Sequence, residues 1–333
     1  MSLKFLDRMD IDFDDLIADI PEELKELAKG LSEYVDLKTD FGFKRIFGVK
    51  EVMLSFLNTF LKIEGGITDL TYINTEILGL TQDDRKSIFD LICLTGKGEY
   101  IVVEMQNLRQ EFYKDRTVLY ASMLILQQAL KGKRKDPKTG KEIDWNYRLP
   151  PVYVINILNF KVGGELVVKQ IEKNILDTDE NPEATEQKYA SYIQLMDVET
   201  KKLFYDKLTL VYIELERFTK KLKDVKSFPE QWIYLIKHLH ELKGSPEELN
   251  IEVVEKILEI AKTAKMSKYE VMIYLKNLHD MGVVRSQFNK MSKTIAEQRD
   301  TIAGLQGSNT ALQSSNTALQ NENAELRRRL GIN

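Results

Sequence analysis

The sequence predicts an α/β fold in which a mixed central sheet is flanked by helices. Three observations lead to this prediction. Residues 70–106 are rich in β-forming residues and contain a short glycine turn, and residues 113–133 have the apolar spacing of a long helix. Residues 150–160 then form a continuous apolar run that begins with two prolines. The resulting order of helix, three strands, helix and strand is typical of helices packed on a sheet.

Helices are the first predicted elements. Residues 1–37 mix acidic with apolar residues, and within them residues 21–35 begin with proline and contain a glycine near their end, as a short helix does. Helical spacing returns over residues 50–62, where the apolar positions are Val52, Met53, Phe56, Leu57, Phe60 and Leu61.

The predicted strands follow. Residues 87–95 and 99–106 form two apolar strands, and the sequence GKG between them predicts a hairpin. The run at 150–160 is expected to be a buried strand. Two further strand candidates cover residues 189–198 and 207–216. Beyond these strands the sequence is predominantly helical.

We therefore divide the chain into four parts. They are an N-terminal helical lead-in (1–37), an α/β core (38–215), a helical region (216–289) and a C-terminal coiled coil (290–333).

Composition limits the class of protein. The chain has 333 residues and a formal net charge of -4, so a nucleic acid would have to meet a local basic patch. Cys93 is the single cysteine, which excludes an internal disulfide and fits a reducing compartment. The N-terminus lacks a signal pattern, and no apolar run approaches the roughly 20 residues that span a bilayer. We expect a cytoplasmic protein.

The C-terminal segment carries a seven-residue repeat. Leucines recur every seven residues, and asparagines occupy three positions of the companion series. Leucine at d with asparagine at a is typical of a two-stranded coiled coil, in which the asparagines fix the register and reduce stability. The alternative is a solvated single helix. The residues expected to dimerise are Ile302, Leu305, Asn309, Leu312, Asn316, Leu319, Asn323 and Leu326.

Three polar residues interrupt the apolar hairpin. Glu104 and Gln106 point to one face of their strand because side chains alternate, and the hairpin would bring Asp90 beside Glu104. Two adjacent carboxylates in apolar surroundings repel, so one is protonated unless a cation lies between them. Oxygen ligands with open water positions suit Mg²⁺ or Mn²⁺. The alternative is that a single acid on a strand faces solvent at an edge.

Residues 87–106 resemble the PD-(D/E)xK nuclease superfamily. The resemblance is to its recombination-promoting nuclease branch, often labelled PD-(D/E)xK nuclease family transposase, which has D…ExQ in place of D…ExK. It extends over about residues 35–260. The other blocks that carry it are TDFGFKRIFG, DDRKSIFD, FYKDRTVLYASMLILQQ and LPPVYVINILNF.

The resemblance implies a restriction-endonuclease-like core and roles for particular residues. It makes Asp90 and Glu104 the metal ligands and places Gln106 where the superfamily has lysine, which leaves the water-activating group uncertain. It also implies that Asp40 is the acidic residue from the first helix. Lys44 lies one turn later and could face the same cleft. Asp40 could instead be the N-cap of its helix.

Basic and aromatic residues complete the candidate site. The resemblance directs Arg116 and Tyr120, spaced i,i+4, toward the scissile phosphate or the carboxylates, and the alternative is a structural ion pair with a buried aromatic. Residues 131–145 contain six basic and three acidic residues, and they include Lys133, Arg134 and Lys135. This loop could contact the DNA backbone or could simply be solvated.

These residues predict a magnesium-dependent DNA endonuclease of low sequence specificity that acts as a homodimer. The resemblance links such an enzyme to recombination, mobile elements or defence against foreign DNA. A second hypothesis is a non-catalytic protein that binds DNA or a protein partner through a nuclease fold. RNA cleavage is a third, because the same metal chemistry would serve.

Overall fold

The computed structural model describes seven segments of the chain. They are residues 20–73, 76–77, 87–130, 134–135, 142–143, 147–162 and 189–332. The chain forms two compact units with their boundary between Leu278 and His279. Among the described residues, none of the helices combines the length and apolarity needed to cross a membrane.

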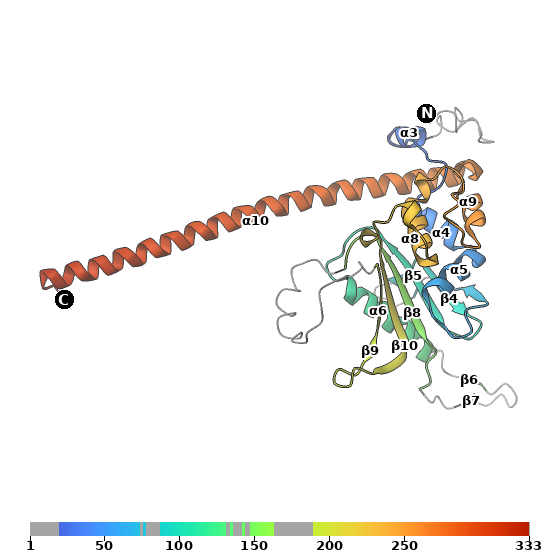
Figure 1. Ribbon diagram of the computed structural model, residues 1–333, viewed down its shortest axis with the longest axis horizontal. Coiled ribbons are helices and arrows are strands. Elements are labelled where there is room, and N and C mark those ends of the chain that lie inside the picture. The colour runs from blue at the N-terminus through green and yellow to red at the C-terminus, as the bar shows by residue number, and fades with distance from the viewer. Residues whose placement is uncertain are drawn as a thin grey trace. The chain divides into compact units, whose positions relative to one another are not determined.

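A six-stranded mixed sheet is the centre of the first unit (Figure 1). Its strand order is β1-β4-β5-β8-β10-β9. Strand β8 runs parallel to both β5 and β10, and the pairs β1–β4, β4–β5 and β9–β10 are antiparallel. The strands are β1 (Leu70–Tyr72), β4 (Leu91–Thr95), β5 (Tyr100–Gln106), β8 (Val152–Leu158), β9 (Ala190–Met196) and β10 (Leu203–Glu214).

Two short hairpins lie outside this sheet. Strands β2 (Glu76–Ile77) and β3 (Ser87–Ile88) form one antiparallel pair, and β6 (Arg134–Lys135) and β7 (Glu142–Ile143) form the other.

The β4–β5 hairpin has the turn that the sequence predicts. Gly98 has φ +85°, a conformation that glycine adopts without strain. Its N–H donates to the carbonyl of Thr95 at 2.9 Å, and Leu91 pairs with Val103 across the hairpin. Cys93 is buried in β4.

Helices cover both faces of the sheet, and the larger core lies on one of them. Side chains alternate along β5, so Ile101, Val103 and Met105 enter the larger core, whereas Val102 enters a smaller core on the opposite face. The helices that contribute to the larger core are α3 (Glu22–Lys29), α4 (Asp40–Phe47), α5 (Lys50–Phe60), α8 (Phe228–His238), α9 (Val254–Ala261) and the start of α10 (Lys268–Leu330).

The opposite face of the sheet is covered by α6 (Tyr113–Leu130). Ala121 and Leu124 of α6 pack in the smaller core with Val152 and Val154 of β8. Figure 1 shows α6 apart from the group formed by α4, α5, α8 and α9. This arrangement confirms the predicted fold class, a mixed sheet flanked by helices with a long C-terminal helix.

The predicted helical region packs on the larger core. Trp232 of α8 is fully buried and stacks against Phe47 of α4, with 5.9 Å between ring centroids. Short 3₁₀ turns separate the elements here: η1 (Leu215–Arg217), η2 (Leu222–Asp224), η3 (Leu239–Glu241) and η4 (Thr263–Lys265). The C-terminal repeat belongs to one 63-residue helix, α10, which begins well before the repeat.

Candidate functional site

Asp90 and Glu104 lie opposite each other across the β4–β5 hairpin. Leu91 pairs with Val103, and Asp90 and Glu104 are the next residues along the two arms of the hairpin. The backbone N–H of Asp90 donates to Oε1 of Glu104 at 3.1 Å. The backbone N–H of Met105 donates to Oδ2 of Asp90 at 2.7 Å. One oxygen of each carboxylate is therefore fixed by the backbone of the neighbouring strand.

The two carboxylates are in an environment that opposes their ionisation. Glu104 is 1% exposed, and burial together with the nearby Asp90 raises its pKa to about 8. Burial is also the main cause that raises the pKa of Asp90, to which the charge of Asp40 adds. Such an upward shift is expected of two carboxyl groups that share an apolar site without a cation.

Gln106 lies on the same strand face as Glu104 and is half-buried. Its side-chain amide interacts with the Glu104 carboxylate, which lowers the pKa of Glu104 and partly offsets burial. Gln106 has no proton to gain or lose near neutral pH, so it can orient a water or a phosphate but cannot act as a general base.

Helix α4 carries Asp40 and Lys44. The Oδ1 atom of Asp40 and Nζ of Lys44 are 2.7 Å apart in an i,i+4 ion pair, and both side chains are about half exposed. Their charges act on Asp90, whose pKa Asp40 raises and Lys44 lowers. The alternative in which Asp40 is the N-cap is wrong. Thr39 occupies that position, and its Oγ1 accepts the N–H of Gly42 at 3.0 Å.

Helix α6 brings a guanidinium group to the carboxylates. The Nη2 atom of Arg116 is 3.6 Å from Oε2 of Glu104, the oxygen that Asp90 does not contact. Its Nε donates to the hydroxyl of Tyr120 at 2.8 Å, and its Cζ lies 5.0 Å from the centre of that ring. Tyr120 is half-buried and meets Phe89 edge-on at 4.5 Å. Both the ion pair and the aromatic contact therefore occur, and they bring Arg116 to the carboxylates.

The sequence did not predict a buried polar group on the strand next to Glu104. Asn156 of β8 stands beside Glu104 in the parallel register and is 1% exposed. Its Oδ1 accepts the hydroxyl of Tyr113 at 2.8 Å, and its Nδ2 donates to the carbonyl of Val211 at 3.2 Å. The available signal was a lone asparagine in an otherwise apolar strand, which at a buried position requires hydrogen-bond partners.

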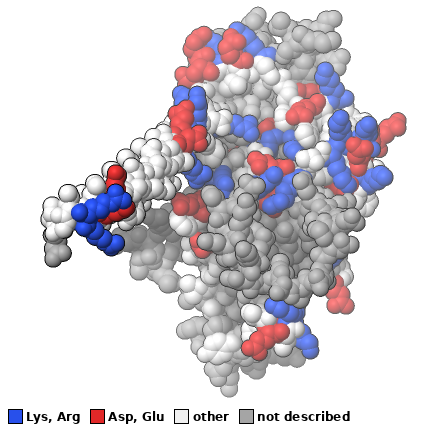
Figure 2. Space-filling model, turned by 60° about the vertical axis from the view of Figure 1, so that its left-hand side comes forward, with Lys and Arg blue, Asp and Glu red and all other residues white. Residues whose placement is uncertain are grey.

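The structure describes little of the basic loop at residues 131–145. Lys133 lies outside the described residues, and only the backbone of Arg134 and Lys135, in β6, is described. Among the described residues on the face that Figure 2 presents, Lys and Arg lie among Asp and Glu, with no broad area of one sign.

The donor set fits a hard divalent cation. No group of three or more His, Cys, Asp or Glu side chains within the described residues could hold a metal ion. Mg²⁺, however, is commonly held by one or two carboxylates together with water and substrate phosphate. Asp90 and Glu104 would supply those two carboxylates, and a cation would offset the burial and the charge repulsion that raise their pKa values.

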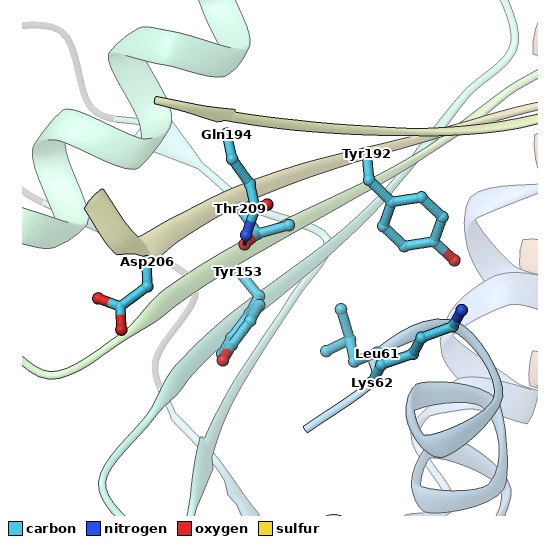
Figure 3. A pocket seen from close by; sticks show the side chains of 7 residues that line it. All are labelled: Leu61, Lys62, Tyr153, Tyr192, Gln194, Asp206 and Thr209. Atoms are coloured by element: carbon cyan, nitrogen blue, oxygen red, sulfur yellow. Dashed lines mark hydrogen bonds between the residues drawn. The ribbon is translucent and has the colours of Figure 1, made fainter. Parts of the chain in front are cut away.

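A pocket on the other face of the sheet is distinct from this site (Figure 3). Its volume is about 340 Å³, and Tyr153 of β8 lines it. Tyr153 is three residues from Asn156, so the two side chains point to opposite faces. The remaining lining residues are Leu61, Lys62, Tyr192, Gln194, Asp206 and Thr209. The pocket therefore contains none of the residues around Glu104.

Comparison with known proteins places the chain in a family. No curated protein and no solved structure matches it. The model of one family, described as PD-(D/E)XK nuclease family transposase, matches residues 37–282. The match begins close to where the resemblance in the sequence begins and continues into the first turns of α10. Because it spans most of the chain and includes the sheet with Asp90, Glu104 and Gln106, the protein belongs to the PD-(D/E)XK nuclease family transposase family.

Proposed function

We propose that the protein is a magnesium-dependent endonuclease that hydrolyses DNA phosphodiester bonds with low sequence specificity. The observation that carries this proposal is the pairing of half-buried Asp90 with buried Glu104, whose carboxylates are each held by a backbone N–H across a hairpin and share one apolar site. A structural role would be better served by apolar residues, because removing carboxylates from water destabilises a fold even when they have partners. Membership of a nuclease family supports the same conclusion.

The proposed roles follow from the position of each side chain. Asp90 and Glu104 would hold Mg²⁺, with Mn²⁺ as a substitute. When bound, such an ion polarises the phosphate and lowers the pKa of a coordinated water. Gln106 would orient the attacking water or the phosphate through its amide. Lys44 and Arg116 would stabilise the negative charge that develops on the phosphate.

DNA is the proposed substrate, and its contacts are expected to be mainly to the backbone. The mixed charges in Figure 2 fit a protein that meets DNA at a limited region. Arg116 and Tyr120, beside the carboxylates, are the proposed substrate contacts together with Lys133, Arg134 and Lys135. Enzymes with such contacts read little sequence, which fits a role in recombination, mobile elements or defence against foreign DNA.

Incubation of supercoiled plasmid with the full-length protein tests this proposal. We expect Mg²⁺-dependent nicking by the wild type and none by Asp90→Asn, which keeps the shape of the side chain but removes its charge. Asp115→Asn is a matched control, because Asp115 is an exposed acid on α6. Equal nicking by Asp90→Asn and the wild type would refute the assigned site. An RNA substrate run in parallel identifies a ribonuclease.

The alternative function is a non-catalytic protein that binds DNA or a protein partner. Retained DNA binding without cleavage under Mg²⁺ or Mn²⁺ would favour it. The intact set of Asp90, Glu104 and Gln106 favours the enzyme, since a binding protein does not need two acids in an apolar site.

We further propose that α10 pairs with a second copy of the chain to form a homodimer. The d-position leucines are exposed in the single chain, at 65% for Leu305 and 69% for Leu312. A helix that keeps a leucine every seven residues on one side is stabilised when those leucines pack against another helix. The asparagines Asn309, Asn316 and Asn323 would then pair across the seam and fix the register.

A further inference from the structure

The N-terminus of α4 has two caps. One lies directly before the helix, and the other comes from a residue that is distant in the sequence. The first N–H groups of a helix have no partner within the helix. Thr39 accepts the N–H of Gly42, whereas the N–H of Phe41 donates to Oδ1 of Asn277 at 2.8 Å. Asn277 belongs to α10 and is 236 residues away in sequence. Asp40, one of the proposed site residues, is directly adjacent to Phe41.

The loop before α4 is fixed by the same part of α10. The N–H of Asp36 donates to the hydroxyl of Tyr274 at 2.7 Å, and Tyr274 is 1% exposed. The ring of Tyr274 also lies 5.7 Å from that of Phe41. The loop and the helix are in close contact, because a Cβ at Gly42 would lie 2.2 Å from the carbonyl oxygen of Asp36.

Side-chain contacts also hold the side of α4 that faces α9 and α10. Arg45 forms an ion pair with Glu270 of α10 and donates from Nε to the carbonyl of Ile260 in α9 at 2.8 Å. Arg45 and Phe41 are each one residue beyond Lys44 and Asp40, which is a rotation of about 100° around the helix axis. One side of α4 is thus held by α9 and α10, while the adjacent side carries the two charges that act on Asp90.

A further contact leads from the same loop to the strand that carries the site. Asn107 donates from Nδ2 to the carbonyl of Lys38, and it directly follows Gln106 at the end of β5. The N–H of Lys38 in turn donates to Oδ1 of Asp36 at 2.9 Å. The loop therefore contacts α10 through Asp36 and β5 through Lys38.

We propose that Asn277 and Tyr274 are positioning residues, which hold the first turn of α4 and so place Asp40 and Lys44 beside Asp90. This inference rests on the proposed nuclease function for its catalytic consequence. The family match runs to residue 282 and so includes both positioning residues. The start of α10 is then part of the architecture of the site and not only the beginning of an assembly helix.

Amide hydrogen exchange and cleavage kinetics on full-length variants test the proposal. Asn277→Ala removes the acceptor, Asn277→Asp keeps an acceptor oxygen, and Lys276→Ala is a control at the adjacent exposed position. We expect Asn277→Ala to exchange the amides of residues 36–47 at least about tenfold faster, while Asn277→Asp and Lys276→Ala resemble the wild type. Tyr274→Phe removes only the hydroxyl and should accelerate exchange at Asp36.

Kinetics separate positioning from general destabilisation. Asn277→Ala should lower kcat by about tenfold to a hundredfold, because small displacements of catalytic groups are costly, and should leave KM for DNA within about twofold. Asn277→Asp should restore kcat. Unchanged kcat in Asn277→Ala would overturn the inference, and so would unchanged exchange of the α4 amides. If the wild type does not cleave, the proposed function fails, and exchange of the α4 amides still decides whether Asn277 holds the helix.

Discussion

Asp90 and Glu104 are held together by two hydrogen bonds across the hairpin that run in opposite directions. The N–H of Asp90 donates to Glu104, and the carboxylate of Asp90 accepts the N–H that follows Glu104 in the chain. A backbone N–H on each strand thus holds the carboxylate of the acid on the opposite strand. This relationship keeps two mutually repelling groups together at a site where burial is the main cause of their raised pKa values.

Replacing Glu104 with glutamine should stabilise the metal-free protein at pH 8.5 and abolish nicking. The folded pKa of Glu104, about 8, is higher than its ordinary value, so the folded state binds an extra proton between those two values. Stability from this group is full at low pH and is lost as pH rises through about 8. Glutamine keeps the neutral form at all pH values, so we expect a gain on the order of 1–2 kcal/mol at pH 8.5 and little at pH 5. Thermal unfolding at both pH values measures it, and a loss of stability at pH 8.5 would contradict the argument.

Mg²⁺ should stabilise the protein more at high pH than at low pH. The ion requires ionised carboxylates. The pKa values of Asp90 and Glu104 are both raised, so protons compete with the ion, and on Glu104 they do so below about pH 8. We expect 5 mM Mg²⁺ to raise Tm by several degrees at pH 8.5 and by much less at pH 6, as on the order of 1 kcal/mol corresponds to about 2–4 °C in a chain of this size. Asp90→Asn should remove the effect, and the exposed control Asp115→Asn should keep it.

Arg116→Ala should move the pH dependence of nicking to higher pH. The guanidinium lowers the pKa of both carboxyl groups, so its removal raises them further and a higher pH is needed to ionise the pair. We also expect the maximal rate to fall by about tenfold to a hundredfold because a cation beside the phosphate is lost. A pH–rate profile measures both effects. If the rate falls but the pH profile is unchanged, Arg116 acts on the phosphate and does not affect ionisation of the carboxyl groups.

Asn156→Ala should destabilise the fold through the buried hydrogen bonds that it removes. The substitution leaves the hydroxyl of Tyr113 and the carbonyl of Val211 without their buried partner. Such a loss costs about 1–3 kcal/mol. Urea unfolding measures it, with Asn159→Ala as the control at a half-buried asparagine just beyond β8. Equal losses in the two variants would contradict this role of Asn156.

Charges placed on the leucine series should separate the proposed dimer. We expect Leu312→Asp/Leu319→Asp to sediment as a monomer, because aspartate at d positions disrupts the packing between helices. Ser314→Asp/Asn321→Asp adds the same charges outside the a and d positions and should remain dimeric. Deletion of residues 290–333 should also give a monomer. A wild type that sediments as a monomer would refute the coiled coil.

Local sequence patterns determined much of the fold. The alternation of apolar residues and the GKG turn predicted the β4–β5 hairpin, and the spacing of Asp90 and Glu104 around that turn was enough to place them side by side. The apolar run at 150–160 likewise predicted β8. These features depend on the period of a strand and on the geometry of a short turn, both of which are encoded by neighbouring residues.

The tertiary structure alone decided which distant residues support the site. The cap of α4 by Asn277 and the contact of Asn156 with Tyr113 join segments far apart in sequence, and no local pattern specifies such partners. The sequence also left open whether Asp40 is a site residue or the N-cap of its helix, because aspartate is a good capping residue. Thr39 is the cap, and the loop before it is held by Tyr274 of α10 through Asp36. The sequence by itself determined the acids and their hairpin, whereas packing between distant helices decided how the charged side chains of α4 are held near them.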